Sequence, residues 1–460
     1  MPPYDGAAVV VAGAGVSGMA AARALRGLGA RVTVVDGDAD RLAALDGVAT
    51  STTGDLPAGT DLVVTSPGWR PSSPLLLAAA AAGVEVIGEV ELAWRLRGPD
   101  AAPWLAVTGT NGKTTTVRML ASILGRAGLR TVATGNVGLP VVDAVLAGTA
   151  GSPGAAASGG YDVLAVELSS FQLHWSSSLR PAAAAVLNVA PDHLDWHGSL
   201  GEYAAAKARI WAGGTAIGNA DDDLARDLLA RAPGRRVGVT LRVPRAGELG
   251  VVEDLLVDRA FPDVAGEATE LASFADVPVP GAHNVANALA AAALARAHGV
   301  PAEAVREGLR AFAPDPHRNA LVRVLDGVAW VDDSKATNPH AAAASLASYD
   351  PVVWVAGGLL KGADVDDLVR RAAPGLRAAV LLGTDRAALA EALARHAPDL
   401  PVVEVARLDT GAMNEVVAAA RTLARPGDTV LLAPAAASMD CFRDYGQRGE
   451  LFAAAVQALA

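Results

Sequence analysis

Residues 108–115 read TGTNGKTT and carry the strongest chemical signal in the chain. They follow an apolar run and open a helical pattern, so their backbone amides are placed to bind phosphate oxygens. Lys113 adds a cation, and the Thr114 hydroxyl can bind Mg²⁺. Val107 replaces the first glycine of the usual phosphate loop, and a plain glycine-rich turn is the alternative interpretation. The run predicts a nucleotide site, with phosphate contacts from Gly109, Thr110, Asn111, Gly112, Lys113, Thr114 and Thr115.

A second glycine-rich turn lies at residues 13–18, which read GAGVSG, and Asp36 ends the next apolar run. This spacing is typical of the dinucleotide fingerprint, in which amides at a helix start bind a pyrophosphate. By itself the fingerprint favours a dehydrogenase, although no set of residues suited to hydride transfer is recognisable elsewhere. The turn alone therefore predicts a pyrophosphate-binding unit.

Glu167 and His193 each follow an apolar run of strand length. Because the carboxyl ends of parallel strands meet at one edge of a sheet, both side chains can reach one ligand, and a carboxylate there can bind a metal ion. Taken singly, Glu167 is better explained as a surface carboxylate, His193 as a structural loop histidine and Lys207 as a solvated helix lysine. Their interpretation depends on the rest of the chain.

The elements that must position these residues alternate between short Val-, Leu- and Ala-rich runs and longer stretches at helical spacing. This pattern predicts an α/β protein with parallel sheets covered by helices. A chain of 460 residues exceeds what one core usually serves, and Gly- and Pro-containing breaks divide it. We expect a Rossmann-like domain at 1–98, a central P-loop ATPase-like domain with a mostly parallel sheet at 99–314, and a Rossmann-like domain at 315–460.

Secondary structure follows from the same pattern. Helices are expected at about 284–298 and from there to 312, a loop at the Gly/Ser/Ala-rich stretch 147–160, and irregular structure between 239 and 280. Strands are expected at 8–12, 31–36, 61–66, 84–87, 105–108, 130–134, 162–166, 183–189, 328–332, 352–356, 379–382, 402–405 and 429–433.

The composition argues against several classes of protein. Hydrophobic residues make up 52% of the chain and charged residues 19%, which fits a globular protein. The net charge of −11 argues against general attraction to nucleic acid or anionic membranes. No export signal is apparent, and no apolar run reaches the roughly 20 residues of a membrane helix. With one cysteine, Cys441, the chain fits a reducing compartment, so we expect a cytoplasmic protein. We also expect it to be a monomer.

The run GTNGKTT resembles the ATP loop of the Mur ligase family. Three further runs resemble family motifs in the same order: 167–173 (ELSSFQL), 188–198 (NVAPDHLDWHG) and 203–210 (YAAAKARI). The resemblance extends from near residue 8 to near residue 455. It implies an ATP-dependent ligase of peptidoglycan precursor synthesis that activates a carboxylate as an acyl phosphate, with ATP and two Mg²⁺ ions, and a first domain that binds the UDP part of the substrate.

The resemblance also implies roles for residues of every expected domain. It implies that Lys207 is carbamylated, which would turn a cation into an anion able to bind Mg²⁺. The implied catalytic residues are Lys113, Glu167, His193 and Lys207, and the implied Mg²⁺ ligands are Thr114, Glu167, His193 and the modified Lys207. Further implied ATP contacts are Asn284, Arg318 and Asp333. The implied contacts to the UDP-linked substrate are Val16, Ser17, Asp36, Gly68, Asn136 and His193.

Two runs near the C-terminus bear on which amino acid is added. Residues 332–340 read DDSKATNPH and residues 433–452 read APAAASMDCFRDYGQRGELF. Both resemble the family members that add D-glutamate to UDP-N-acetylmuramoyl-L-alanine. Three alternatives stay open: another Mur or folylpolyglutamate-type ligase, a nucleotide-sugar-binding regulator without catalysis, and a dehydrogenase. The implied D-glutamate contacts are Thr337, Lys361, Ser438 and Tyr445.

Overall fold

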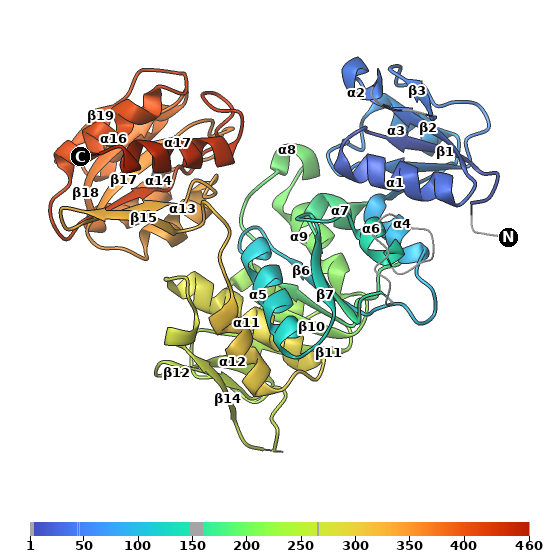
Figure 1. Ribbon diagram of the computed structural model, residues 1–460, viewed down its shortest axis with the longest axis horizontal. Helices are drawn as coiled ribbons and strands as arrows, with labels where there is room; N and C mark the ends of the chain where they lie inside the picture. The colour runs from blue at the N-terminus through green and yellow to red at the C-terminus, as the bar shows by residue number, and fades with distance from the viewer. Residues whose placement is uncertain (1–3, 44, 46, 148–159, 265, 460) are drawn as a thin grey trace. The chain divides into compact units, whose positions relative to one another are not determined.

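The structure is a computed structural model that describes residues 4–43, 45, 47–147, 160–264 and 266–459 (Figure 1). The loop expected at 147–160 therefore lies almost wholly outside the described residues. These residues form two compact units, one comprising the chain up to residue 277 with 286–312, the other 278–285 with the chain from residue 313 onward. The domain boundaries expected after residues 98 and 314 stay predictions. Within the described chain, no helix has the length and apolar character that crossing a membrane requires.

The first sheet, in the blue part of Figure 1, has five parallel strands. Its elements are β1 (Ala8–Ala12), α1 (Val16–Gly27), β2 (Arg31–Val35), α2 (Ala39–Ala43), β3 (Ala49–Ser51), β4 (Leu62–Thr65), α3 (Pro74–Ala81), β5 (Glu85–Gly88) and α4 (Glu89–Arg95). Successive strand side chains face opposite ways, so Val9 packs with Leu25 of α1 and Val10 with Leu75 of α3. In the strand order β3-β2-β1-β4-β5, successive strands are added on opposite sides of β1, so the switch point of the topology lies between β1 and β4, where open α/β sheets bind ligands at the carboxyl ends of their strands.

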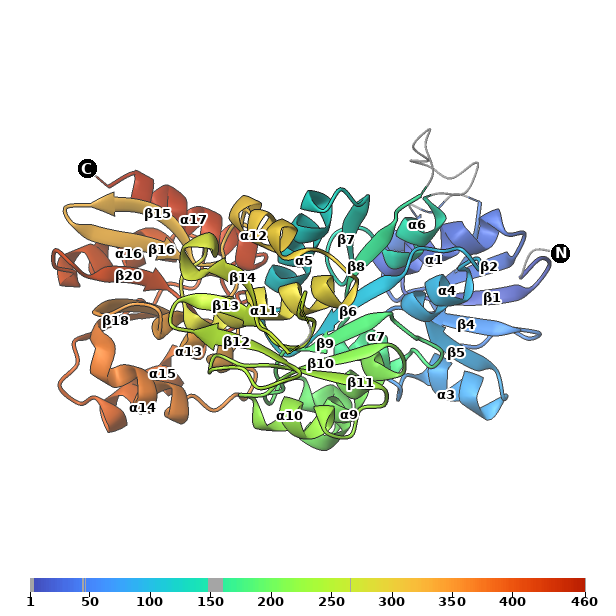
Figure 2. The same cartoon turned by 90° about the horizontal axis from the view of Figure 1, so that it is seen from below.

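The second sheet has nine strands, and those from β6 to β12 are parallel. They are β6 (Trp104–Thr108), β7 (Thr131–Gly135), β8 (Val163–Glu167), β9 (Ala183–Val186), β10 (Thr215–Asn219), β11 (Arg235–Val239), β12 (Glu248–Val252), β13 (Leu255–Asp258) and β14 (Thr269–Ser273). The order is β14-β13-β12-β11-β10-β9-β6-β8-β7, and Figure 2 shows β6, β9 and β10 side by side. The segments after β6, β8 and β9 must therefore meet at one edge of the sheet.

Helices cover this sheet, and α5 packs against α12 through a hydrogen bond of 2.7 Å from Ser122 Oγ to the Gly308 carbonyl. The helices are α5 (Lys113–Arg126), α6 (Val141–Leu146), α7 (Ser170–His174), α8 (Leu194–His197), α9 (Leu200–Ala208), α10 (Asp223–Leu229), α11 (Ala282–Ala297) and α12 (Ala302–Ala311).

Two expectations about this sheet were wrong. The region 239–280 is not irregular, because it contains β12, β13 and β14, which pair antiparallel with one another. The turn between β12 and β13 is Glu253-Asp254, with Glu253 at φ 55°, and it lacks the Asn-Gly type of sequence that announces a hairpin. The strand expected at 183–189 ends at Val186, because the chain then leaves the sheet to bind the phosphate loop.

The third sheet has six strands in the order β15-β16-β20-β17-β18-β19, parallel except for β15 at one edge. Its elements are β15 (Ala320–Leu325), β16 (Val328–Asp332), α13 (Pro339–Leu346), β17 (Val352–Gly357), α14 (Asp366–Ala372), β18 (Leu376–Leu382), α15 (Arg386–His396), β19 (Val402–Glu404), α16 (Ala412–Leu423), β20 (Thr429–Leu432) and α17 (Tyr445–Gln457). The α/β class expected from the sequence is confirmed in all three sheets.

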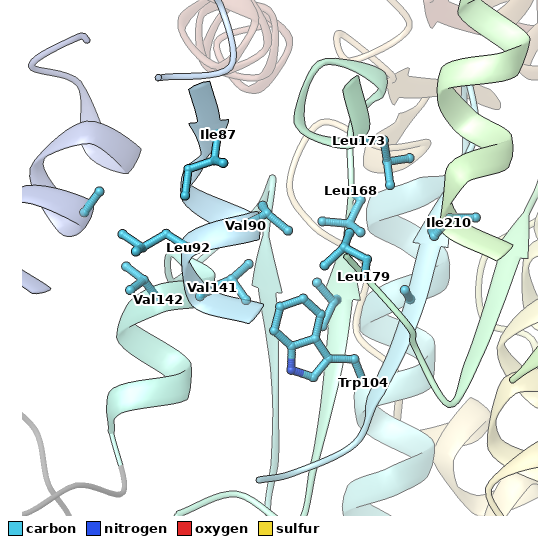
Figure 3. Packing of buried hydrophobic residues seen from close by; sticks show 14 of the residues in the cluster. Ile87, Val90, Leu92, Trp104, Val141, Val142, Leu168, Leu173, Leu179 and Ile210 are labelled. Carbon is cyan, nitrogen blue, oxygen red and sulfur yellow. The ribbon is translucent and has the colours of Figure 1, made fainter. Parts of the chain in front are cut away.

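Helix α4 joins the first sheet to the second through a shared apolar core, in which Leu92 lies beside Val141 and Val142 of α6 (Figure 3). Two buried carboxylates on the same helix add directed contacts. Glu89 Oε1 accepts the Val142 amide at 2.7 Å. Glu91 Oε2 accepts the amides of residues 177 and 178 at 2.9 and 3.1 Å. Burying carboxylates is costly unless they are hydrogen-bonded, so these contacts hold α4 in one position.

We expect the stability of Glu89→Gln to differ from that of the wild type in a pH-dependent way. Burial raises the pKa of Glu89 from 4.5 to about 7. The folded protein therefore binds this proton more tightly, and the group's contribution to stability is full below pH 4.5 and is lost as the pH rises to 7. Gln stays neutral, so the variant should gain up to about 3 kcal/mol relative to the wild type across this range. Urea unfolding at several pH values measures the difference.

Glu91→Gln is the matched control on the same helix. Burial acts to raise the pKa of Glu91, but hydrogen bonds from Ser178 and Ser177 lower it below its usual value. Its contribution to stability is present above the unfolded pKa, so this variant should be less stable than the wild type at neutral pH. A stability difference for Glu89→Gln that does not change with pH would contradict the prediction.

Candidate active site

The phosphate loop between β6 and α5 is held in place by Asn188, which follows β9. The Thr110 amide donates to the Asn188 carbonyl at 3.0 Å, and the Asn111 amide donates to Asn188 Oδ1 at 2.8 Å. Asn188 Nδ2 returns a bond of 3.1 Å to the Asn111 carbonyl. This residue belongs to the run NVAPDHLDWHG, but sequence reasoning gave it no role. Its one local signal is an amide side chain directly after a buried strand.

Gly112 ends the loop in a left-handed conformation, with φ 82°. A Cβ atom at this position would lie 2.3 Å from Oδ1 of Asn287, which is buried on α11. Glycine is therefore required both by the backbone angle and by the approach of α11. The amides of the first turn of α5, which begins at Lys113, are available to an anion. Asn287 was also missed, although it lies one helical turn from the expected Asn284.

Two lysine side chains donate to the same carbonyl oxygen of this loop. Lys113 Nζ lies 2.9 Å from the Gly109 oxygen and 2.9 Å from the Thr110 oxygen. Lys207 Nζ, on α9, lies 2.8 Å from the Gly109 oxygen and 4.4 Å from the centre of the Tyr203 ring. Burial, together with the charge of Lys113, holds the pKa of Lys207 well below its usual range. Lys207, expected to be solvated when judged singly, is only 1% exposed.

Glu167 is the last residue of β8 and is 1% exposed, so the simple interpretation as a surface carboxylate is wrong. Its Oε1 accepts a bond of 2.8 Å from Asn136 Nδ2, which places Asn136 beside the carboxylate. Its Oε2 is buried without a hydrogen-bond partner among the described residues. An unpaired buried carboxylate oxygen is costly, and a bound cation would satisfy it.

The protein side chains near Glu167 could hold a metal ion only together with other ligands. The described residues contain no group of three or more His, Cys, Asp and Glu side chains able to hold a metal ion. A cation at Glu167 would therefore need further oxygen ligands, such as the Thr114 hydroxyl, phosphate oxygens or a carbamate on Lys207. The unpaired Glu167 oxygen and the hard oxygen donors fit Mg²⁺.

His193 begins the short helix α8 with a backbone φ of 53°, which is strained for a residue other than glycine. Its ring centre lies 4.8 Å from that of Phe171 on α7, and Phe171 also contacts Trp196 and His197. Burial lowers the pKa of His193, and the nearby charges of Lys113 and Lys207 act in the same direction. The aromatic cluster thus holds a neutral imidazole near the two lysines.

The glycine turn of the first sheet lies at the carboxyl end of β1, at the switch point of the topology between β1 and β4. A Cβ at Gly18 would lie 1.9 Å from the Gly13 carbonyl oxygen, so only glycine allows this tight turn. Asp36 Oδ2 accepts the Ala14 amide at 2.7 Å, and its Oδ1 accepts the Asp38 amide at 3.0 Å. Asp36 therefore stabilises the glycine turn through the Ala14 amide.

Other residues expected to contact the UDP-linked substrate are exposed or half-buried. Val16 is 74% exposed at the start of α1, and Gly68 is exposed after β4. Ser17 is half-buried next to Val16. The hydroxyl of Ser66 is buried without a hydrogen-bond partner among the described residues.

The residues expected to bind D-glutamate follow three neighbouring strands of the third sheet, β16, β20 and β17, or begin α17. Lys361 has a left-handed φ of 55° and is exposed, whereas Ser438 is buried. Tyr445 is 37% exposed, and Lys335 Nζ lies 3.6 Å from the centre of its ring. Thr337 follows β16 and is half-buried.

Three residues expected at the ATP lie in the compact unit that does not contain the phosphate loop, so their contact with ATP stays a prediction. Asn284 Nδ2 donates to the Pro280 carbonyl at 2.8 Å. Arg318 Nε lies 3.8 Å from Asp315 Oδ2. Burial raises the pKa of Asp333 to about 6.

The scarcity of lysine is a signal that sequence reasoning did not use. Only four of the 38 basic residues are lysines, namely Lys113, Lys207, Lys335 and Lys361. A chain that uses arginine for nearly every other cation retains lysine where a compact, single-centred amine is needed. Lys335, beside Tyr445, could have been recognised as a site residue in this way.

Comparisons with known proteins agree with this geometry. Residues 107–295 match the family described as Mur ligase middle domain, and residues 317–436 match the one described as Mur ligase, glutamate ligase domain. Residues 2–85 match the alanine dehydrogenase/PNT C-terminal domain.

Individual relatives match along the full length. The chain is 62% identical to a UDP-N-acetylmuramoylalanine--D-glutamate ligase from Thermobifida fusca, over 99% of both chains. It is 59% identical to the protein of the same description from Streptomyces avermitilis, over 100% of both chains. A crystal structure of MurF from Acinetobacter baumannii covers 99% of this chain and 92% of its own, with a TM-score of 0.61 and 20% identity, which shows a likeness of fold.

We expect Lys113→Ala to fold normally but to lose ATP turnover by at least about 100-fold, because the change removes the ammonium group expected to stabilise the charge of the phosphates. Arg118→Ala, which removes an exposed cation from the same helix, is the matched control and should keep full activity. Phosphate release and thermal unfolding of both variants provide the measurement. Normal turnover by Lys113→Ala would show that the loop is not the ATP site.

Proposed function

This chain belongs to the Mur ligase family, and we propose that it is the member that joins D-glutamate to UDP-N-acetylmuramoyl-L-alanine, an ATP-dependent step of peptidoglycan precursor synthesis. Its full-length relatives at 62% and 59% identity carry the description of that ligase. The observation that carries the chemistry is the pair of lysine amines on the Gly109 carbonyl beside a buried carboxylate.

The proposed reaction has two steps, because a carboxylate resists attack by an amine. First, an oxygen of the alanine carboxylate forms a bond to the γ-phosphorus of ATP, and the bond from that phosphorus to the β,γ-bridging oxygen breaks, releasing ADP. The product is an acyl phosphate. Second, the amine of D-glutamate attacks the acyl carbon, phosphate leaves with the C–O bonding pair, and the amine loses a proton. The net products are an amide, ADP and phosphate.

In the first step the chain must stabilise negative charge on the phosphoryl group during transfer. The amides at the start of α5 and the Lys113 ammonium group would act on the transferred phosphoryl group, and such preorganised charge is the main contribution to phosphoryl transfer. Two Mg²⁺ ions would be held by Thr114 on one side and by Glu167, His193 and carbamylated Lys207 on the other. Bound there, they would neutralise phosphate charge.

Carbamylation of Lys207 is supported by the position of its amine. Only an unprotonated amine adds to CO₂, and burial beside Lys113 favours the unprotonated form. A carbamate would also replace a cation–cation contact with an attractive one. The modified side chain would lie near the unpaired oxygen of Glu167, on the same edge of the sheet.

The remaining site residues are assigned by the position of their strands. In this proposal the first sheet binds the UDP part of the substrate through Val16, Ser17, Asp36 and Gly68. Asn136, which donates to Glu167, is a further contact to the UDP-linked substrate. The match of residues 2–85 to a dehydrogenase domain reflects the shared dinucleotide-binding fold, since fold does not decide function. In the same proposal, D-glutamate is bound by Thr337, Lys361, Ser438 and Tyr445.

The setting of the protein follows from the same substrates. One chain supplies every proposed site residue, so the enzyme can act as a monomer. ATP and a UDP-linked precursor point to the cytoplasm, and the single cysteine suits its reducing conditions. The net charge of −11 disfavours nucleic acid as a partner.

The decisive assay for the function is phosphate release with ATP, Mg²⁺ and UDP-N-acetylmuramoyl-L-alanine, with and without an amino acid. We expect sustained release only with D-glutamate, and little with L-glutamate, meso-diaminopimelate or glycine, because the acyl phosphate waits for a matching amine. Turnover with another amino acid in preference to D-glutamate would assign the chain to a different ligase.

We expect ¹³C-labelled bicarbonate to give a carbamate signal in the NMR spectrum of the wild-type protein. Lys207→Arg should lose this signal, because a guanidinium group does not add CO₂, and should also lose activity. Lys113→Ala should keep the signal, since its substitution leaves the Lys207 amine in place. A wild-type spectrum without any carbamate signal at saturating bicarbonate would sink the proposal for Lys207.

A further inference from the structure

Arg448, on the second turn of α17, is a buried cation whose charge the structure does not neutralise by contact. Its side chain is fully buried, at 0% exposure. Its hydrogen bonds go to neutral oxygens, and within the part of the chain that the structure describes no carboxylate forms an ion pair with it. Burial lowers the pKa of Arg448 to about 10, although the charges of Asp440 and Asp332 act to raise it, so the guanidinium stays charged at neutral pH. Burying a charge in this way is costly and calls for a function.

The bonds of Arg448 reach three separate segments. Nε donates to Ser334 Oγ at 2.9 Å and Nη2 donates to the Ser334 carbonyl at 2.8 Å. Nη1 donates to the Ala436 carbonyl at 3.1 Å and to the Gly357 carbonyl at 3.4 Å. These segments follow β16, β20 and β17, which are adjacent and parallel in the third sheet. One guanidinium therefore fixes the carboxyl ends of three neighbouring strands, where open α/β sheets bind their ligands.

Each of these segments carries one of the proposed D-glutamate residues. Thr337 follows Ser334 by three residues, Lys361 follows Gly357 by four, and Ser438 follows Ala436 by two. The fourth, Tyr445, begins α17 one turn before Arg448, and its carbonyl accepts a bond of 2.8 Å from Ser334 Oγ. Arg448 thus bonds to the three segments that carry Thr337, Lys361 and Ser438, and reaches Tyr445 through Ser334.

The backbone of these segments is strained, which explains why they need such a link. Lys361 and Ala435 have left-handed φ angles of 55° and 61°, although neither is glycine. Such conformations persist only where surrounding contacts hold them. Arg448 binds the carbonyls of Gly357 and Ala436, which lie close to the two strained residues in the chain.

We propose that Arg448 is a positioning residue of the D-glutamate site: the planar guanidinium group sets the three segments relative to one another. The inference rests on the proposed function. Arginine suits the task because its donors diverge in one plane and its charge persists when it is buried.

The test is steady-state kinetics of Arg448→Met and Arg448→Lys. For Arg448→Met, the KM for D-glutamate should rise at least about tenfold, with the KM values for ATP and the UDP-linked substrate unchanged. Lysine preserves the charge but loses the planar guanidinium group, so its KM should be intermediate.

Arg296→Lys is the matched control, since Arg296 is also buried but bonds to Asp258 in the second sheet. It should lower the melting temperature without changing the KM for D-glutamate. Should Arg448→Met fail to fold, Ser334→Ala removes the bond from Arg448 Nε and the bond to the Tyr445 carbonyl, keeps the other bonds of Arg448, and should still raise the KM for D-glutamate. The proposal is overturned if folded Arg448→Lys and Ser334→Ala both bind D-glutamate as the wild type does, or if all KM values shift together. Failure of the wild type to use D-glutamate would instead refute the proposed function.

Discussion

Two lysine amines donate to one carbonyl oxygen of the phosphate loop, and the proposed active site depends on that arrangement. Lys113 and Lys207 both donate to Gly109. Two ammonium groups so close repel strongly in a buried setting, so either one amine loses its proton or anions enter. The loop is therefore suited to negative charge, which the proposed reaction supplies as phosphate and as a carbamate on Lys207. At the same edge of the second sheet, Glu167 Oε2 is buried without a hydrogen-bond partner among the described residues, and a cation would stabilise it.

The same rule of topology positions ligand-binding residues in each sheet. In the first, the switch point of the topology lies between β1 and β4, and the glycine turn follows β1 there. In the second, β6 lies between β9 and β8, so the phosphate loop, Asn188 and Glu167 meet. In the third, the ends of β16, β20 and β17 carry the residues assigned to D-glutamate. Parallel strands all direct their carboxyl ends to one edge, which is why residues far apart in the chain gather there.

Buried charges do the positioning that an apolar core cannot do. Apolar contacts are non-directional, so a core alone leaves loops free to shift. Glu89 and Glu91 bind backbone amides and hold α4 between two sheets, and Arg448 binds carbonyls and holds three loops. Each such contact is directional and costly to break. The protein places them where an element must keep one position relative to a site.

The sequence by itself determined the features that are local in the chain: the α/β class, most strands of the three sheets, the phosphate loop with Lys113, and Glu167 and His193 as strand-end candidates. These are visible because periodicity and glycine spacing act over a few residues. Only the tertiary structure decided that Asn188 and Asn287 shape the loop, that Asn136 binds Glu167, that Lys207 is buried, and that Arg448 links three loops. Those facts depend on contacts between residues tens to more than a hundred positions apart, and no local pattern encodes which distant side chain will arrive.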